Sequence, residues 1–70
     1  MSHEEKIQFL REQGETISPS TLARVIGGNP YLYNLAAKDG TLTFPHMWRG
    51  RNLRIFTQPV INLLQGGKTT

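Results

Sequence analysis

Helix-start and helix-stop signals follow one another closely between residues 18 and 40, and they constrain the fold more than any other feature. A residue that can cap a helix precedes a proline at two places, Ser18–Pro19 and Asn29–Pro30. Proline suits the first position of a helix because that position needs no backbone N–H. Each stretch ends in glycine, at Gly27–Gly28 and at Gly40, as helices commonly do. The sequence therefore predicts two short helices, joined by the tight connection IGGNP.

The buried faces of these two helices follow from the spacing of their apolar residues. The first helix is expected to bury Leu22, Val25 and Ile26. The second helix can bury a stripe formed by Leu32, Leu35 and Ala36, or in a competing register a stripe formed by Tyr33, Ala36 and Ala37. We favour the leucine stripe, which leaves three polar residues together on the opposite side: Tyr31, Asn34 and Lys38.

The N-terminal segment has the pattern of a further helix. Ser2 and Glu5 have the spacing of a capping box, and Ile7 and Leu10 share one face of the helix that follows. Phe9 falls off this apolar stripe. We expect its side chain to be exposed, with a contact to another molecule as the less favoured alternative.

The period of the pattern changes after Pro45, which marks the edge or the start of a strand. A strand over His46–Arg49, a turn near Gly50–Asn52 and a strand over Leu53–Phe56 together predict a hairpin. In the second strand, the leucine and the isoleucine point to one face and leave Arg54 on the other. Glycine at the tip gives the backbone freedom that a tight turn needs.

A closing helix follows the hairpin and completes the predicted fold. Thr57 is expected to cap it, and three residues are expected to face the core: Val60, Leu63 and Leu64. The aromatic side chains around the hairpin are expected to pack, in or partly in the core for Trp48 and as packing residues for Phe44 and Phe56. The fold class is thus mainly α with a small β-hairpin, organised as an acidic N-terminal helix (residues 1–15), a main domain (residues 16–66) and a polar tail (residues 67–70).

Size and composition exclude several classes of protein. A chain of 70 residues buries only about 60% of its unfolded surface, so its stability is small and a partner or a second copy would add to it. The absence of cysteine excludes disulfides and thiolate metal sites. Acidic residues near the N-terminus and the lack of a long apolar run argue against a signal peptide or a membrane span. We expect a cytoplasmic protein without a membrane partner.

Catalytic, cofactor and metal sites are not expected. The two histidines, His3 and His46, are far apart in the sequence and belong to no motif. The C-terminal QGGKTT resembles the end of a phosphate-binding P-loop, but Asn62 stands where that motif needs its first glycine. No helix can follow the lysine either, so we reject this motif.

The charge is unevenly placed along the chain, which points to a polyanionic partner. Residues 1–15 carry four acids and two bases, a balance of −2, whereas residues 16–70 carry six bases and one acid, a balance of +5. Three arginines fall within the hairpin at Arg49, Arg51 and Arg54. Basic surfaces of this kind favour nucleic acid, although a solvated hairpin with charged edges is the alternative.

The two short helices and the hairpin together resemble a helix-turn-helix followed by a wing, which can bind double-stranded DNA. The second helix can lie in the major groove, where bases can be read by Tyr31, Tyr33 and Asn34, while Lys38 contacts phosphate. The wing residues expected to contact phosphates or the minor groove are Arg49, Arg51, Asn52 and Arg54.

Residues 17–66 also resemble a known family, the excisionase-like, MerR-type winged-helix proteins of phages and integrative elements. The likeness rests on a helix that ends in Val25–Gly27, a hairpin led by Pro45 with Gly50 at its tip, the apolar–basic–apolar strand Leu53–Ile55 and the closing helix Pro59–Leu64. The order and spacing of these features carry the resemblance more than any one of them.

The resemblance implies a winged helix-turn-helix with an extra N-terminal helix, which binds DNA through the helix beginning at Pro30 and the wing Arg49–Arg54. Proteins of this family bend or coat DNA at attachment sites, often as adjacent copies or dimers, and direct an integrase or recombinase toward excision. Many also repress transcription of a neighbouring gene. The alternative is a protein-interaction module on the same fold, an anti-repressor or inhibitor, favoured by the acidic first helix and by the single cation of the second helix, Lys38.

Overall fold

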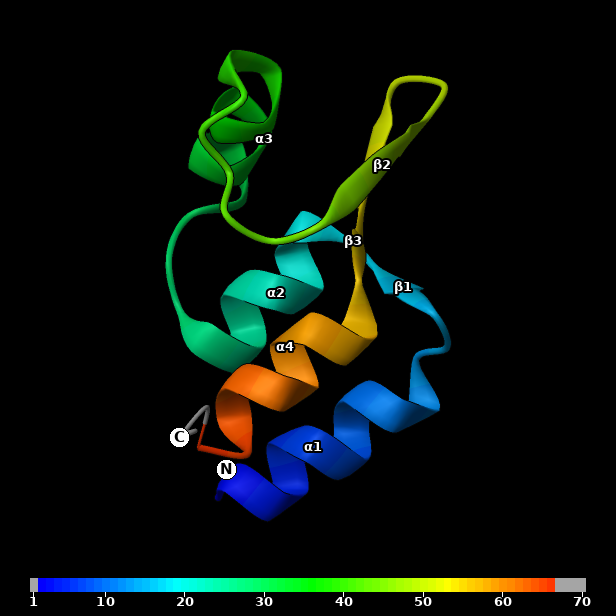
Figure 1. Cartoon of the computed structure of the whole chain (residues 1–70), viewed down its shortest axis with the longest axis vertical. Coiled ribbons are helices and arrows are strands. Elements are labelled where there is room, and N and C mark those ends of the chain that lie inside the picture. The colour runs from blue at the N-terminus through cyan, green and yellow to red at the C-terminus, as the bar shows by residue number, and fades with distance from the viewer. Residues whose placement is uncertain (1, 67–70) are drawn as a thin grey trace.

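The computed structural model of the chain describes residues 2–66, which form four helices and a three-stranded antiparallel sheet (Figure 1). The helices are α1 (His3–Glu12), α2 (Pro19–Ile26), α3 (Pro30–Asp39) and α4 (Thr57–Leu64). The strands are β1 (Thr16–Ile17), β2 (His46–Arg49) and β3 (Asn52–Phe56), and the sheet has the order β1-β3-β2. The expected helix-rich fold with a small hairpin is confirmed. The polar tail predicted for residues 67–70 lies outside the described residues.

The elements are arranged so that α3 and the β2–β3 hairpin stand side by side at one end of the molecule and α1 lies at the other (Figure 1). Between these ends, α2 packs against α3, and α4 packs against α1. Within residues 2–66, none of the helices has the length and apolar character needed to cross a lipid bilayer.

Local capping explains where three of the helices begin. The Ser2 side chain accepts from the N–H of Glu5 (3.2 Å), and the Ser2 N–H donates to the Glu5 carboxylate (2.9 Å), which completes the predicted capping box. Hydrogen bonds from Ser2, first from its backbone N–H and then from its side chain, stabilise the charged carboxylate and lower the pKa of Glu5. The caps Ser18 and Asn29 are confirmed at α2 and α3, each followed by its proline.

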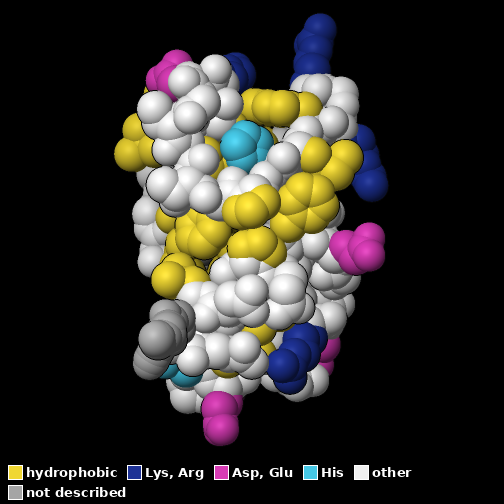
Figure 2. Space-filling model, in the orientation of Figure 1, with side chains coloured by type: hydrophobic (Ala, Val, Ile, Leu, Met, Phe, Trp, Pro, Cys, Tyr) yellow, Lys and Arg dark blue, Asp and Glu magenta, His cyan; other side chains and the backbone are white. Residues whose placement is uncertain are grey.

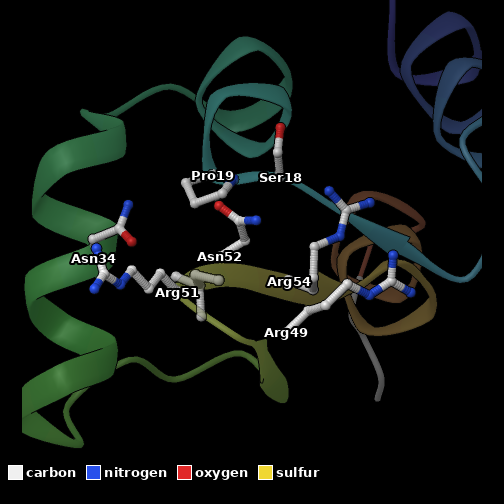
Figure 3. A pocket seen from close by; sticks show the side chains of 8 residues that line it. Ser18, Pro19, Asn34, Arg49, Arg51, Asn52 and Arg54 are labelled. Carbon is white, nitrogen blue, oxygen red and sulfur yellow. The ribbon is translucent and has the colours of Figure 1, made fainter.

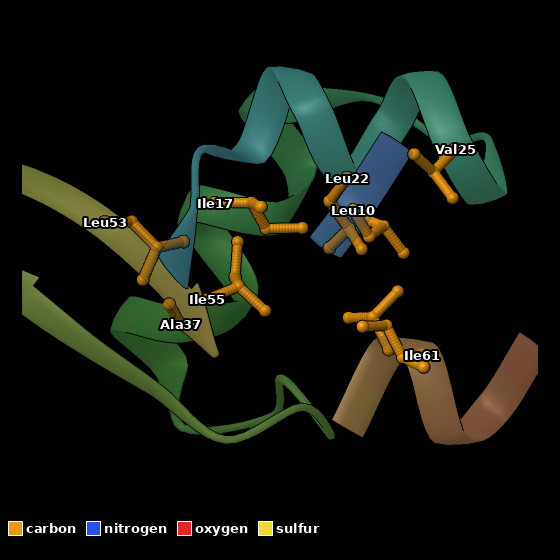
Figure 4. Packing of buried hydrophobic residues seen from close by; sticks show 9 residues of the cluster. Leu10, Ile17, Leu22, Val25, Ala37, Leu53, Ile55 and Ile61 are labelled. Atoms are coloured by element: carbon orange, nitrogen blue, oxygen red, sulfur yellow. The ribbon is translucent and has the colours of Figure 1, made fainter. Parts of the chain in front are cut away.

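One buried cluster draws on every element except β2 (Figure 4). Its members are Leu10, Ile17, Leu22, Val25, Ala37, Leu53, Ile55, Val60 and Ile61. The strand β2 is held by its pairing with β3, in the register Met47 to Arg54 and Trp48 to Leu53. The outer strand of the hairpin is therefore free to carry surface residues, and Trp48 keeps 37% of its surface exposed, outside the core.

The predicted leucine stripe of α3 is wrong, and the competing register is the one observed. Ala37 is buried and Tyr33 packs against the core, whereas Leu32 and Leu35 are 57% and 37% exposed. The Tyr33 hydroxyl donates to the carbonyl of Gly27, so a polar contact at the α2–α3 connection favours the side of α3 that carries this tyrosine.

The start of α4 also differs from the prediction. Phe56, not Thr57, is the N-cap residue, and it makes no side-chain capping bond. Thr57 is the first helical residue and is buried, and its N–H donates to the Glu15 carbonyl (2.8 Å), beside β1. The two-residue strand β1, which pairs Thr16 with Phe56, was not predicted from the sequence. Its pairing with β3 determines how the chain enters α4.

Three apolar side chains lie elsewhere than predicted. Leu63 of α4 is 52% exposed, and Ile61 is buried in its place. Phe56, predicted to be a packing residue, is 38% exposed and is not among the side chains that pack against the buried cluster. Phe9 is not simply exposed, because it packs against the core and the Arg24 guanidinium lies 5.4 Å from its ring centre. This cation–π contact joins α1 to α2.

Candidate functional site

A hollow of about 250 Å³ opens between the start of α2, one side of α3 and the hairpin (Figure 3). Its lining residues are Ser18, Pro19, Asn34, Arg49, Arg51, Asn52, Leu53 and Arg54. Five of these eight were singled out from the sequence as candidate binding residues, and the structure brings them together. None of the eight is acidic, so the three guanidinium groups of the hollow face no carboxylate within it.

The hairpin turn places Arg51 at its tip. Arg49 pairs with Asn52, which leaves Gly50 and Arg51 as the two turn residues. Gly50 has φ of +61°, and no residue other than glycine has positive φ within the described chain, which is the pattern of a type II′ turn. From this tip the Arg51 side chain extends toward Asn34 of α3, across the hollow (Figure 3).

The other two arginines lie next to each other on the hairpin, and their guanidinium groups point the same way (Figure 3). Arg54 is half-buried and braces the sheet: its Nε donates to Thr16 Oγ1 (3.2 Å) and its Nη2 to the Thr16 carbonyl (3.1 Å). Of the three arginines, it alone has a side-chain hydrogen bond within residues 2–66. Arg49 and Arg51 are exposed, so their donors are available to a ligand.

The helix α3 contributes less to the hollow than the sequence suggested. Asn34 is half-buried and lines it, and its Nδ2 donates to the Pro30 carbonyl (3.0 Å), which leaves Oδ1 as an acceptor. Tyr31 and Lys38 are exposed on the outside of the helix. Tyr33 lies on the core side with its hydroxyl bonded to Gly27, so it stands apart from the other three candidates.

Sequence reasoning missed the contribution of α2. Ser18 and Pro19 line the hollow because the start of α2 lies beside β3, although at least 31 positions separate these residues from the hairpin tip along the chain. Their role at the start of α2 could be predicted from the sequence, and Ser18 Oγ does accept from the N–H of Thr21 (3.2 Å). Their position beside the arginines could not be predicted, because it depends on how α2 packs against β3.

A second hollow, of about 420 Å³, lies near α1 and the start of α4. It is lined by Arg11, Gly14, Glu15, Phe56, Thr57, Gln58 and Ile61, so a base and an acid are both present. The first hollow is the better candidate site because its charges all have one sign. In the part of the chain that the structure describes, no three side chains of the usual metal-binding types come together.

The chemistry of the first hollow is that of an anion-binding surface. Planar guanidinium groups match the geometry of phosphate or carboxylate oxygens, and the amides of Asn34 and Asn52 add donors and acceptors. Its lining residues include no histidine, carboxylate or thiol that could act as a general base or a nucleophile. Comparisons of the chain with protein-family models, with curated proteins and with solved structures gave no match.

Proposed function

We propose that this protein binds double-stranded DNA, with α2 and α3 acting as a helix-turn-helix and the β2–β3 hairpin as its wing. The observation that carries the proposal is the hollow between α3 and the hairpin, which is lined by three arginines and by no acidic residue. Phosphates of the DNA backbone are the ligands that such an arrangement suits best.

The dimensions of this end of the molecule fit a duplex. The ten-residue helix α3 is about 15 Å long, and an α-helix with its side chains has a diameter close to the width of the major groove, about 12 Å. With α3 in the major groove, the hairpin beside it reaches the adjacent backbone or minor groove (Figure 1). The acids of α1 lie at the opposite end, where they do not oppose binding.

The cellular role that we infer is architectural, as an excisionase of a phage or mobile element, as a transcriptional regulator, or as both. Lys38 and the arginines Arg49, Arg51 and Arg54 give about four phosphate contacts, so the log–log salt slope of a single copy is about −3.6. Such binding is weak at physiological salt. Adjacent copies, a homodimer or a recombinase bound beside the protein would supply the remaining affinity.

The experiment that tests DNA binding is fluorescence anisotropy with random-sequence duplex DNA at about 50 and 200 mM salt. A slope of about −3.6 weakens the wild type about 150-fold between these two concentrations. Because Arg54 also braces β1, the test variant is Arg49→Gln/Arg51→Gln, which removes exposed charges only. Its slope should fall to about −1.8, or about a 12-fold change.

The matched control is Lys6→Gln/Arg11→Gln, which removes the same charge from α1 at the other end of the molecule. It should bind DNA almost as tightly as the wild type, with only the small loss that follows from a lower net charge. Equal weakening of the two double variants would show that only net charge matters. No binding by the wild type at low salt would overturn the proposal.

The second candidate is a protein-interaction module on the same fold, such as an anti-repressor. It is favoured by the exposed apolar side chains on α3: Tyr31 is 66% and Leu32 57% exposed. Under this function the Arg49→Gln/Arg51→Gln variant keeps its partner, whereas substitution of these α3 side chains releases it. A pull-down with the wild type and both variants separates the two candidates.

A further inference from the structure

The outward face of α3 is apolar and almost neutral. Ala37 marks the buried side, and helical spacing places Leu35 nearly opposite to it. Tyr31 and Leu32 flank this leucine one turn earlier, and all three side chains are exposed, by 66%, 57% and 37% for Tyr31, Leu32 and Leu35. The single cation and the single anion of the helix cancel each other.

These side chains lie at the same end of the molecule as the arginines. Figure 1 places α3 beside the hairpin at this end, and Figure 2 shows that both basic and hydrophobic side chains are exposed there. A single exposed leucine is ordinary on a protein surface, but here three large apolar side chains share one face of α3, at the end of the molecule that also carries the basic hairpin (Figure 1). Asn34 marks the side of α3 toward the hairpin, so Leu32, two residues earlier, is turned away from it (Figure 3). A polyanion that also displays apolar groups could contact both the hairpin and this face.

We propose that α3 recognises the C5-methyl groups of thymine in the major groove, so that the preferred ligand of the site is A·T-rich duplex DNA. The inference rests on the DNA binding proposed above and names its substrate class. The thymine methyl is the apolar group that base edges display in the major groove. Leu32, Leu35 and the Tyr31 ring can contact these methyls while Arg49 and Arg51 contact phosphates.

Hydrogen-bond readout by α3 is less well supported by its geometry. Asn34, which could otherwise pair with adenine, is half-buried on the side that faces the hairpin, and one of its Nδ2 hydrogens is used by Pro30 (Figure 3). Tyr33 is turned to the core side. The groups that remain on the outward face of α3 are mainly apolar, so they distinguish bases by shape and methyl contact.

The spacing along α3 also fits stacked base pairs. Tyr31 and Leu35 are one turn apart, about 6 Å along the helix axis at 1.5 Å per residue. Successive base pairs are separated by about 3.4 Å. The apolar face therefore spans nearly two base-pair steps, and we expect it to contact methyl groups on two of the base pairs within that span.

The test compares duplexes that differ only in methyl groups. One A·T-rich duplex is prepared with thymine and again with uracil, and one G·C-rich duplex with cytosine and again with 5-methylcytosine. Burial of one methyl changes affinity about 4-fold, so two contacts predict about 15-fold weaker binding to the uracil duplex. The 5-methylcytosine duplex should bind more tightly than its unmodified form, because it restores the same methyl on another base.

Two variants locate the effect on the protein. Leu32→Ala/Leu35→Ala changes exposed side chains, so it should fold, as a circular dichroism spectrum will show. It should lose most of the preference for the thymine duplex, and only the contact of the Tyr31 ring remains. The control Leu63→Ala removes an equally exposed leucine from α4 and should keep the wild-type difference. The salt slope should stay near that of the wild type in both variants, since neither loses a charge.

The outcomes separate this inference from the function on which it rests. If the wild type binds both duplexes with equal affinity and the expected salt slope, DNA binding stands and methyl recognition is overturned. It is also overturned if Leu32→Ala/Leu35→Ala keeps the full preference for thymine. If no duplex is bound at low salt, the proposed function fails as well, and the apolar face of α3 is then a protein-binding surface.

Discussion

The N-terminal helix is expected to be an integral part of the folded domain, and Leu10→Ala tests this directly. Leu10 has no exposed surface and is the one residue of α1 in the buried cluster, where it lies close to Leu22 of α2 (Figure 4). The acidic residues of α1 are exposed and contribute little to this packing. Leu10 is the fully buried residue of α1, and Ile7 and Phe9 pack against the same cluster from its edge.

The size of the effect follows from burial and from chain length. Leu→Ala at a fully buried position costs about 2.7–5 kcal/mol, through lost transfer free energy and the cavity that remains. A chain of 70 residues has a total free energy of unfolding of about 3.5–10 kcal/mol. A loss of about 3 kcal/mol therefore removes a third or more of the stability and lowers Tm by about 12–24 °C.

Thermal unfolding followed by circular dichroism measures this loss. Gln8→Ala, at an exposed position of the same helix, is the control and should change the free energy of unfolding by less than about 0.5 kcal/mol. Because Leu10→Ala can unfold so small a domain, Leu10→Met is measured beside it, with an expected loss below about 1.5 kcal/mol. A Tm for Leu10→Ala within a few degrees of the Gln8→Ala value would refute the packing of α1 described above.

Two further predictions concern the hairpin. Thr16→Val removes one hydrogen-bond acceptor of Arg54 but no charge, so the free energy of unfolding measured in urea should fall by about 1 kcal/mol and the salt slope of DNA binding should not change. Arg54→Gln should lower the free energy of unfolding as well and should also reduce the salt slope by about 0.9, because it removes a charge. An altered slope in Thr16→Val would contradict this division of roles. Gly50→Ala should lower the free energy of unfolding by about 1–3 kcal/mol because of the φ of +61° at this position; a Cβ there would meet no atom within 4 Å, so no steric clash adds to the loss. D-alanine at the same position favours positive φ and should restore the stability. Equal stability of the two alanine forms would show that the turn has another conformation.

Local signals made much of the fold predictable from the sequence. The starts of α2 and α3 were correct because capping residues and prolines act within one turn of the chain. The hairpin was predicted nearly residue by residue, because Gly50 and the alternation of Leu53 and Ile55 are also local features. For the same reason the hairpin arginines were recognised as one group.

What the sequence did not reveal depends on packing between distant segments. The observed register of α3 places Tyr33 on the core side, where its hydroxyl bonds to Gly27, and leaves Leu32 and Leu35 exposed; this contact joins two helices and is not a local pattern. The strand β1 has two residues and is defined only by its partner β3. The part of the hollow formed by Ser18 and Pro19 requires α2 to lie beside that same strand, a contact that no local pattern encodes.

The contact between Tyr33 and the α2–α3 connection also limits how this protein can change in evolution. A Cβ on Gly28 would collide with the Tyr33 hydroxyl and ring, and the φ of Gly28, +102°, disfavours a side chain even without the ring. Position 28 is thus closed to single substitutions, whereas position 33 can lose its hydroxyl or its ring without a collision. We expect homologous sequences to vary at residue 33 while they keep glycine at residue 28, so that a substitution at residue 28 is accepted only after residue 33 has become smaller.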